Sequence, residues 1–279
     1  SASPERMRRT QPGYGVVIPD DLVPRNEGLP DDDGLFVTDT ETGETKLLIS
    51  LRECVEEAVP RSEFNDYTDY EFYGFHCKWN PQGDRLIFTI RAFPNNGTSR
   101  FDMMRERLLR FDVYTLDNNG GNLCLAVPAS EWEKGGHHIN WFPDGRTLSM
   151  NLNLERDELR FVQVEADGSG LRKMLDNLRG SGHPTVHPNG KHILTDAYAH
   201  GKLADENGTI PIRLIDRQTG EDRTLIRIRT RTPQQQEFAA LRVDPHPAWD
   251  SSHGWIAFNG FADGTRRVYV ADLRDIVRC

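Results

Sequence analysis

The sequence predicts an all-β protein of the β-propeller class, and three observations predict it. Four segments share a register that starts at a histidine, passes through a polar turn and ends in an alternating apolar run. Each of these segments is followed by a further alternating strand that closes on a glycine- or asparagine-containing turn or ends the chain. Four short strands in a repeat of about 45 residues are typical of a propeller blade. Helical periodicity is nearly absent.

The inner hairpin of each repeat begins at the shared histidine. The four hairpins are HCKWNPQGDRLIF from His76, HINWFPDGRTLSM from His138, HPTVHPNGKHIL from His183 and HPAWDSSHGWIAF from His246. Proline and glycine between two alternating runs are typical of tight turns between strands. The turn in the last hairpin reads as one residue longer than the other three.

The closing strands set the expected blade boundaries. Residues 34–60 read as the closing hairpin of a partial blade, and blades are expected at 70–130, 135–178, 180–230 and 242–279. Together they predict one propeller domain over 1–279. Short helices are expected only at 51–58 and 103–109.

About four to five blades are visible, because the chain starts near the end of one blade and ends on the third strand of another. The segment Tyr14-Gly-Val-Val-Ile18 is a candidate strand to complete the last blade. Either the propeller is small or its N-terminal blades lie outside this sequence, and we favour the second interpretation.

Composition narrows the function classes. Hydrophobic residues make up 37% and charged residues 28%, which is typical of a globular protein. No apolar run is long enough to span a membrane, and a net charge of −9 disfavours nucleic acid as a partner. The negative net charge remains compatible with a small anionic ligand that binds in a local basic pocket. The N-terminal residues do not form a signal peptide, and we favour a cytoplasmic or periplasmic location with the oligomeric state open.

The repeated histidine is the strongest chemical signal. The innermost strand of a blade lines the central channel, so equivalent positions in successive blades face one axis. Four histidines in one register are therefore expected to converge. Imidazoles grouped in this way suit a divalent metal, proton transfer or both. The alternative is that each histidine merely packs at the start of a strand.

The last repeat adds a carboxylate to this group. Asp244 and His246 are two residues apart and face the same side of a strand. With His183 they could supply three nitrogen and oxygen ligands and leave positions open for substrate. Arg242 has the same parity and could pair with a carboxylate.

At these residues the chain resembles the oligogalacturonate lyase family of seven-bladed propellers. His138 in HINWFPDG, His183 in HPTVHPNG and His246 in DPHP match family motifs. Asp244 stands in place of the first histidine of a His-Pro-His-Pro run, and a metal-binding glutamine of the family falls on Leu241. RRTQPGYG and DDDGLFVTDTETGETKLLISL instead resemble TolB-like propeller proteins of uncharacterised function.

The first resemblance implies a metal-assisted lyase that cleaves uronic-acid oligosaccharides by β-elimination. It implies a divalent ion, manganese first with calcium or zinc as alternatives, held by His183, Asp244 and His246 against an acidic oligosaccharide. Arg110, with Arg107 as its rival, or His138 would take the C5 proton.

Further roles follow from the same mechanism. His76 would stabilise the intermediate or assist the leaving group, with Tyr198 as a weaker candidate acid. The residues expected to bind the substrate are Arg91, Arg242 and Tyr198.

Two rival functions remain. A non-catalytic TolB-like propeller could bind a protein or a glycan, and the leucine at position 241 favours it. A hydrolase would need an α/β domain, but the sequence has no G-x-S-x-G nucleophile motif.

Several aromatic residues are expected to be structural or peripheral. Trp79, Trp141 and Trp249 share one register and are expected in the core between blades. Tyr67, Tyr70 and Tyr73 are expected in a loop over the channel. The histidines outside the register, expected on the surface, are His187, His192, His200 and His253.

Overall fold

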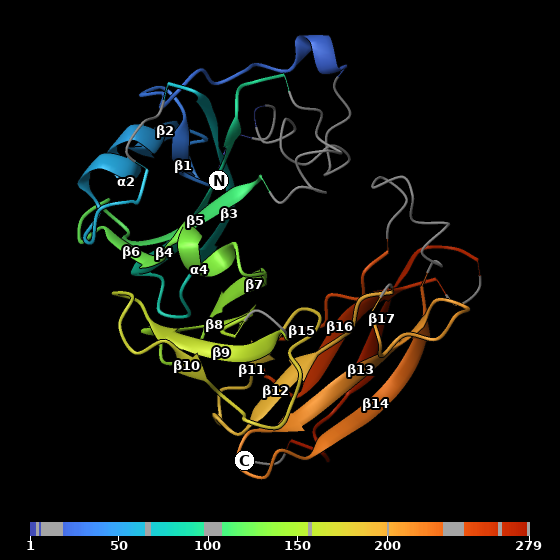
Figure 1. Ribbon diagram of the computed structural model, residues 1–279. Helices are drawn as coiled ribbons and strands as arrows, with labels where there is room; N and C mark the ends of the chain where they lie inside the picture. The colour runs from blue at the N-terminus through green and yellow to red at the C-terminus, as the bar shows by residue number, and fades with distance from the viewer. Residues whose placement is uncertain are drawn as a thin grey trace. The chain divides into compact units, whose positions relative to one another are not determined.

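The computed structural model confirms the expected all-β propeller class (Figure 1). It describes residues 1–3, 6, 19–64, 68–97, 108–155, 158–199, 201–230, 243–261 and 264–277. Strands that follow one another in sequence pair antiparallel, as in propeller blades. Contacts divide the chain into unit 1, Ser1–Lys134 with Glu165–Gly170, and unit 2, Gly135–Val164 with Leu171–Cys279. That 1–279 forms one domain stays a prediction.

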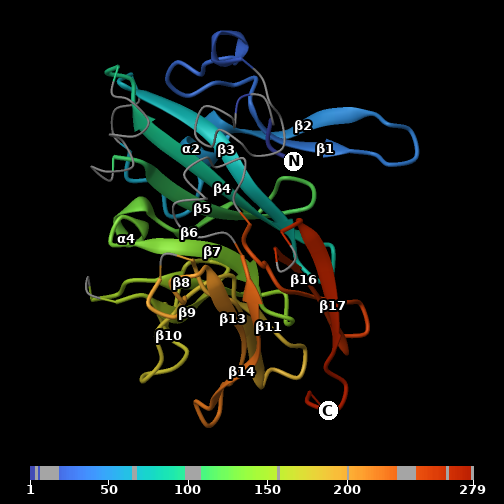
Figure 2. The same cartoon turned by 90° about the vertical axis from the view of Figure 1, so that its right-hand side faces the viewer.

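Unit 1 contains two sheets. The first pairs β1 (Gly34–Thr38) with β2 (Thr45–Ser50), and Ala2 forms an antiparallel bridge to Leu35 of β1. The candidate strand at 14–18 lies outside the described residues. The second sheet consists of β3 (Tyr70–Trp79), β4 (Arg85–Pro94), β5 (Arg110–Asp117) and β6 (Cys124–Val127), which lie side by side in that order (Figure 2).

Helices are short. Those given for the described residues are η1 (Asp20–Leu22), α2 (Leu51–Glu57) and α4 (Ala129–Trp132). The expected helix at 51–58 is confirmed, and a capping box between Ser50 and Glu53 explains where it begins. Most of the expected helix at 103–109 lies outside the described residues. Within the described part of the chain, no helix has the length and apolarity that a membrane crossing needs.

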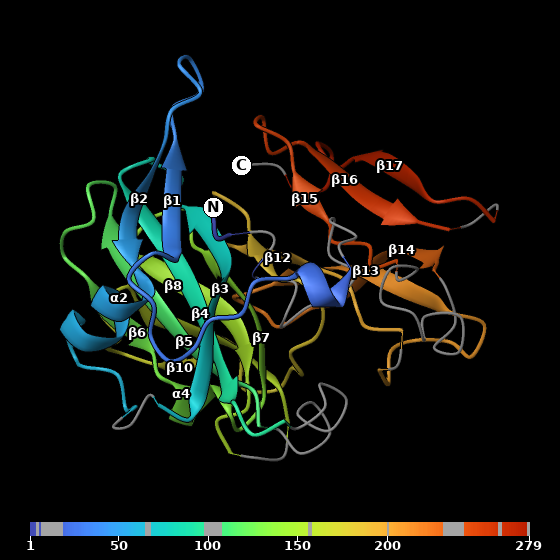
Figure 3. The same ribbon diagram turned by 90° about the horizontal axis from the view of Figure 1, so that it is seen from above.

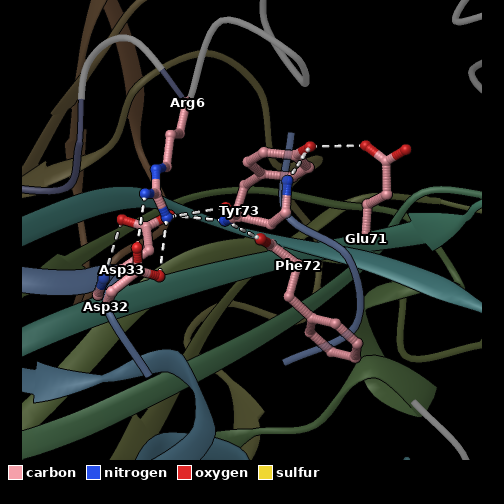
Figure 4. Close-up of polar contacts among 8 residues, drawn as sticks. Arg6, Asp32, Asp33, Glu71, Phe72 and Tyr73 are labelled. Atoms are coloured by element: carbon pink, nitrogen blue, oxygen red, sulfur yellow. Dashed lines mark hydrogen bonds and ion pairs between the residues drawn. The ribbon is translucent and has the colours of Figure 1, made fainter. Parts of the chain in front are cut away.

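A buried polar network ties the segment before β1 to β3 in unit 1 (Figure 4). Asn26 donates to Asp33 at 2.7 Å, and the Tyr73 hydroxyl accepts from the Asn26 main chain at 3.1 Å and donates to Glu71 at 2.6 Å. The Arg6 guanidinium lies 4.0 Å from Asp33. Tyr73 is fully buried in β3. The expectation of a loop was wrong for Tyr70 and Tyr73, because both lie in β3 and pair with β4. Tyr67 lies outside the described residues.

Unit 2 contains three sheets. The first consists of β7 (Gly136–Trp141), β8 (Thr147–Leu152), β9 (Arg160–Glu165) and β10 (Arg172–Lys173). The second consists of β11 (Thr185–Val186), β12 (His192–Thr195), β13 (Thr209–Asp216) and β14 (Asp222–Arg229). The third consists, within the described residues, of β15 (Ala248–Trp249), β16 (Trp255–Gly260) and β17 (Arg267–Asp272) (Figure 3).

The four inner hairpins have one pairing register. The pairs that follow the shared histidines are Trp79 with Leu86, Trp141 with Leu148, Val186 with Ile193 and Trp249 with Ile256. The spacing between the paired residues is the same in all four. The last turn was therefore wrongly read as longer, since its glycine lies one position later without changing the pairing.

The shared tryptophan register does not produce shared burial. Trp141 is 5% exposed, whereas Trp79 is 51% exposed and Trp249 is half-buried. The expectation of core packing was wrong for Trp79. Register places a side chain on a face of its sheet, but neighbouring segments decide whether that face is covered.

Candidate metal centre

The three shared histidines of unit 2 lie together. His138 is on β7, His183 precedes β11 and His246 precedes β15. The ring centroid of His183 lies 3.3 Å from that of His246 and 4.0 Å from that of His138. The short approach between these rings shows that the starts of three successive inner hairpins bring imidazoles to one place. The expectation that Asp244 and His246 lie on one strand was wrong, because β15 begins only at Ala248 and the backbone at His246 is left-handed.

The backbone at two of these histidines is in the left-handed region. His138 has φ 54° and His246 has φ 46°. His138 also lies in a bulge of β7, where the pairing with β8 shifts. Such φ values are uncommon for residues other than glycine, and strained residues and bulges gather at functional sites.

His183, Asp244 and His246 form a group that fits a metal ion. One possible ligand atom of each residue lies within 4.8 Å of the others. The His183 Nε2 atom is buried and has no hydrogen-bond partner among the described residues. A buried imidazole nitrogen without a partner is costly unless something binds it. Two imidazoles and one carboxylate are donors that suit manganese or zinc.

Asp196 is a fully buried carboxylate behind this group. Its Oδ1 accepts the His183 main-chain N–H at 2.7 Å and lies 2.8 Å from His183 Nδ1, and its Oδ2 accepts the His246 main-chain N–H at 3.0 Å. Burial acts to raise the pKa of Asp196, but the neighbouring His183 and His246 together outweigh burial, so this pKa lies below its ordinary value.

The residue before His183 has to be glycine. Gly182 has φ 66°, and a Cβ there would collide with the carboxylate and main chain of Asp196. The Gly182 carbonyl accepts from Asn151 Nδ2 at 2.8 Å and from the Tyr198 hydroxyl at 3.2 Å. Tyr198, expected to bind substrate or act as an acid, is thus buried and supports the turn that carries His183.

A pocket of about 290 Å³ adjoins Asp244. Asp244 and Asn259 form part of its wall, together with Arg266 and Arg267 at the start of β17. The pocket is therefore lined by a candidate metal ligand and by two arginines of the same unit.

Three further predicted residues belong to unit 1. His76 lies in a bulge of β3 with its ring stacked on Phe75 at 3.7 Å. Arg91 is buried on β4, with its guanidinium 3.2 Å from the Phe75 ring centroid. Arg110 begins β5 and lies over an aromatic ring. Their participation in the site stays a prediction.

The predicted residue Arg242 lies outside the described residues, and so does Arg107, the rival of Arg110. His187, expected on the surface, is only 3% exposed. Its Nδ1 accepts from the Asn189 main chain at 3.1 Å and its Nε2 lies 3.1 Å from the His253 carbonyl. Both ring nitrogens therefore have partners within the fold, and the surface expectation was wrong.

Sequence reasoning missed Asp196. It stands at the end of an apolar run, ILTD, where β12 ends. A charged residue in an otherwise buried strand signals a paired group, because burial without a partner is costly. That signal could have predicted that Asp196 is a buried carboxylate with a partner, but it could not have predicted which residues are its partners.

The fold and the site thus define a β-propeller with a candidate metal centre in unit 2. Comparisons with protein-family models and with curated proteins find no match. Similar solved structures include TolB from Acinetobacter baumannii, 12% identical over 74% of this chain and 56% of that chain, with a TM-score of 0.44. The chain therefore spans little more than half the length of that TolB.

Two oligogalacturonate lyases are also similar in structure. The enzyme from Vibrio parahaemolyticus is 11% identical over 85% of this chain and 71% of that chain, with a TM-score of 0.48. An oligogalacturonate lyase in complex with manganese is 15% identical over 87% of this chain and 72% of that chain, with a TM-score of 0.48. None of these similarities assigns an activity to this chain.

Proposed function

We propose that this chain is a metal-assisted lyase that cleaves uronic-acid-containing oligo- or polysaccharides by β-elimination. The observation that carries the proposal is the group of His183, Asp244 and His246, with its buried Nε2 atom lacking a partner among the described residues. The sequence motifs around His138, His183 and His246 support the same assignment.

The chemistry needs an acceptor for the C5 proton of a uronate. A divalent ion held by His183, Asp244 and His246 would neutralise the uronate carboxylate and make this proton easier to remove. His138 is the acceptor that the geometry favours, because its ring lies 4.0 Å from that of His183. As the C5–H bond breaks, its electron pair forms the C4–C5 double bond, and the C4–O4 bond breaks with its pair staying on O4, which takes a proton from solvent. Arg110 as acceptor and His76 as assistant stay predictions.

The charge of the site supports an acidic sugar as the ligand. Arg266 and Arg267 line the pocket beside Asp244, and guanidinium groups pair well with carboxylates. Local potential rather than the net charge of −9 governs binding at such a pocket.

The test is a lyase assay on polygalacturonate with Mn²⁺ present. Elimination creates an unsaturated product that absorbs in the ultraviolet, whereas hydrolysis yields new reducing ends without this absorbance. We expect absorbance to rise with the wild-type protein and to stop when a chelator is added. Constant absorbance across several uronate substrates, with metal present, would refute the lyase proposal.

The second candidate is a non-catalytic propeller that binds a glycan or a protein. The observation that favours it is Leu241, whose side chain cannot ligate a metal. Such a protein would bind the oligosaccharide in calorimetry without forming product, and it need not retain stoichiometric metal after dialysis.

A further inference from the structure

The Asp196 carboxylate dictates which nitrogen of His183 can bind a ligand. An ionised carboxylate offers only acceptors, so the ring nitrogen that faces it must carry the proton. His183 Nδ1 lies 2.8 Å and 2.9 Å from the two oxygens of Asp196. In the neutral ring the lone pair therefore resides on Nε2, the buried atom without a partner among the described residues.

The same carboxylate also joins two distant segments of unit 2. Its Oδ1 accepts from the main chain of His183, and its Oδ2 accepts from that of His246, 50 residues away from Asp196. The strained φ of 46° at His246 occurs at this hydrogen bond. Asp196 thus fixes the separation of two candidate ligands as well as the tautomer of one.

We infer that Asp196 is the positioning residue of the metal centre, and this inference rests on the metal site of the proposed function. Asp196 does not itself bind the ion, because its oxygens are already directed to N–H groups of the two histidines. It presents His183 Nε2 with a free lone pair and holds the His246 backbone beside it. Residues that orient metal-binding histidines in this way raise metal affinity about 10- to 100-fold.

The variant Asp196→Asn tests this role. The side-chain amide of asparagine has one oxygen acceptor where aspartate has two. In either orientation its NH₂ group therefore faces another donor, the main-chain N–H of His183 or that of His246. In the orientation that turns its NH₂ toward the His183 ring, the amide would also donate to Nδ1 and move the ring proton to Nε2. We expect Mn²⁺ affinity to fall about 10- to 100-fold in calorimetry. Imidazole ¹⁵N spectra of metal-free protein should show the change of tautomer at His183.

The matched control is Asp112→Asn in unit 1. Asp112 is also a buried carboxylate, and it accepts from Ser62 Oγ at 2.6 Å, Tyr114 Oη at 3.0 Å and the Ala129 main chain at 2.7 Å. Hydroxyl groups can rotate and accept from an amide, so this variant should retain its network. We expect its Mn²⁺ affinity and its His183 tautomer to be those of the wild type.

Three outcomes decide the inference. Wild-type Mn²⁺ affinity in Asp196→Asn overturns it. So does an Nε2–H tautomer in metal-free wild-type protein, a measurement that needs no variant to fold. A wild type that binds Mn²⁺, loses affinity with Asp196→Asn and forms no unsaturated product supports the role of Asp196 and refutes the lyase proposal alone.

Discussion

Asp112 in unit 1 and Asp196 in unit 2 are both buried carboxylates that accept three polar donors, but their pKa values shift in opposite directions. Burial raises the pKa of Asp112, although hydrogen bonds from Ser62 and Tyr114 counteract the effect. At Asp196 burial also acts to raise the pKa, but His183 and His246 together overcome it and lower the pKa. Neutral donors satisfy a carboxylate, whereas imidazoles stabilise its charge. The comparison separates a structural carboxylate from one that belongs to a candidate site.

The largest expected effect is the loss of metal binding in His183→Ala. Removing the buried Nε2 atom takes away one of three candidate ligands, so we expect Mn²⁺ affinity to fall at least about 100-fold. Equilibrium dialysis with metal analysis measures it. His187→Ala is the matched control, because His187 is equally buried and flanks the same strand β11. If both variants bind Mn²⁺ like the wild type, His183 is not a metal ligand. Asp196 then supports no metal centre, and it does not differ in function from Asp112.

Asp112→Ala should affect stability and leave the metal centre unchanged. The substitution leaves three buried donors without their acceptor, and such changes lower the free energy of unfolding by about 2–4 kcal/mol. Urea denaturation followed by circular dichroism gives this value. Unchanged stability together with weaker Mn²⁺ binding would reverse the roles assigned to the two carboxylates.

Lys78 extends the comparison to a partly buried cation. Burial lowers its pKa to about 8 from 10.5, so the charged form is disfavoured in the folded state. The destabilisation is absent above about pH 10.5, grows as the pH falls and is complete below about pH 8. We expect Lys78→Met to raise the free energy of unfolding by about 1–3 kcal/mol at pH 7. A gain that persists unchanged at pH 11 would contradict this origin.

The smallest expected effect concerns ligand binding in the pocket beside Asp244. Replacing both Arg266 and Arg267 by alanine should weaken binding of an oligogalacturonate about 10-fold, since two carboxylate partners are lost. Calorimetry at low and moderate salt measures it. The exposed pair Arg223 and Arg229 on β14 provides a control with the same change in net charge. Equal weakening in both double variants would indicate a general charge effect.

Much of the fold could be predicted from the sequence because its determinants are local. Turn residues and alternating runs predicted the inner hairpins, and their pairing has the same spacing in all four repeats. The burial of individual side chains was harder to predict from the sequence. Trp79 and Trp141 share a register, yet Trp79 is exposed and Trp141 is in the core. The sequence shows which face of a strand a side chain occupies, but not what covers that face.

The sequence by itself determined the propeller class and the repetition of the histidine, and it predicted that these histidines converge, because each follows from a repeated pattern. Only the tertiary structure decided how closely His138, His183 and His246 approach one another in unit 2. It also decided that Asp244 lies beside His246 although neither is in a strand, and that Asp196 holds two of the histidines. The physical reason is that a hydrogen bond depends on distance in space. The two N–H groups that Asp196 accepts come from segments on either side of it, and folding alone brings them to one carboxylate.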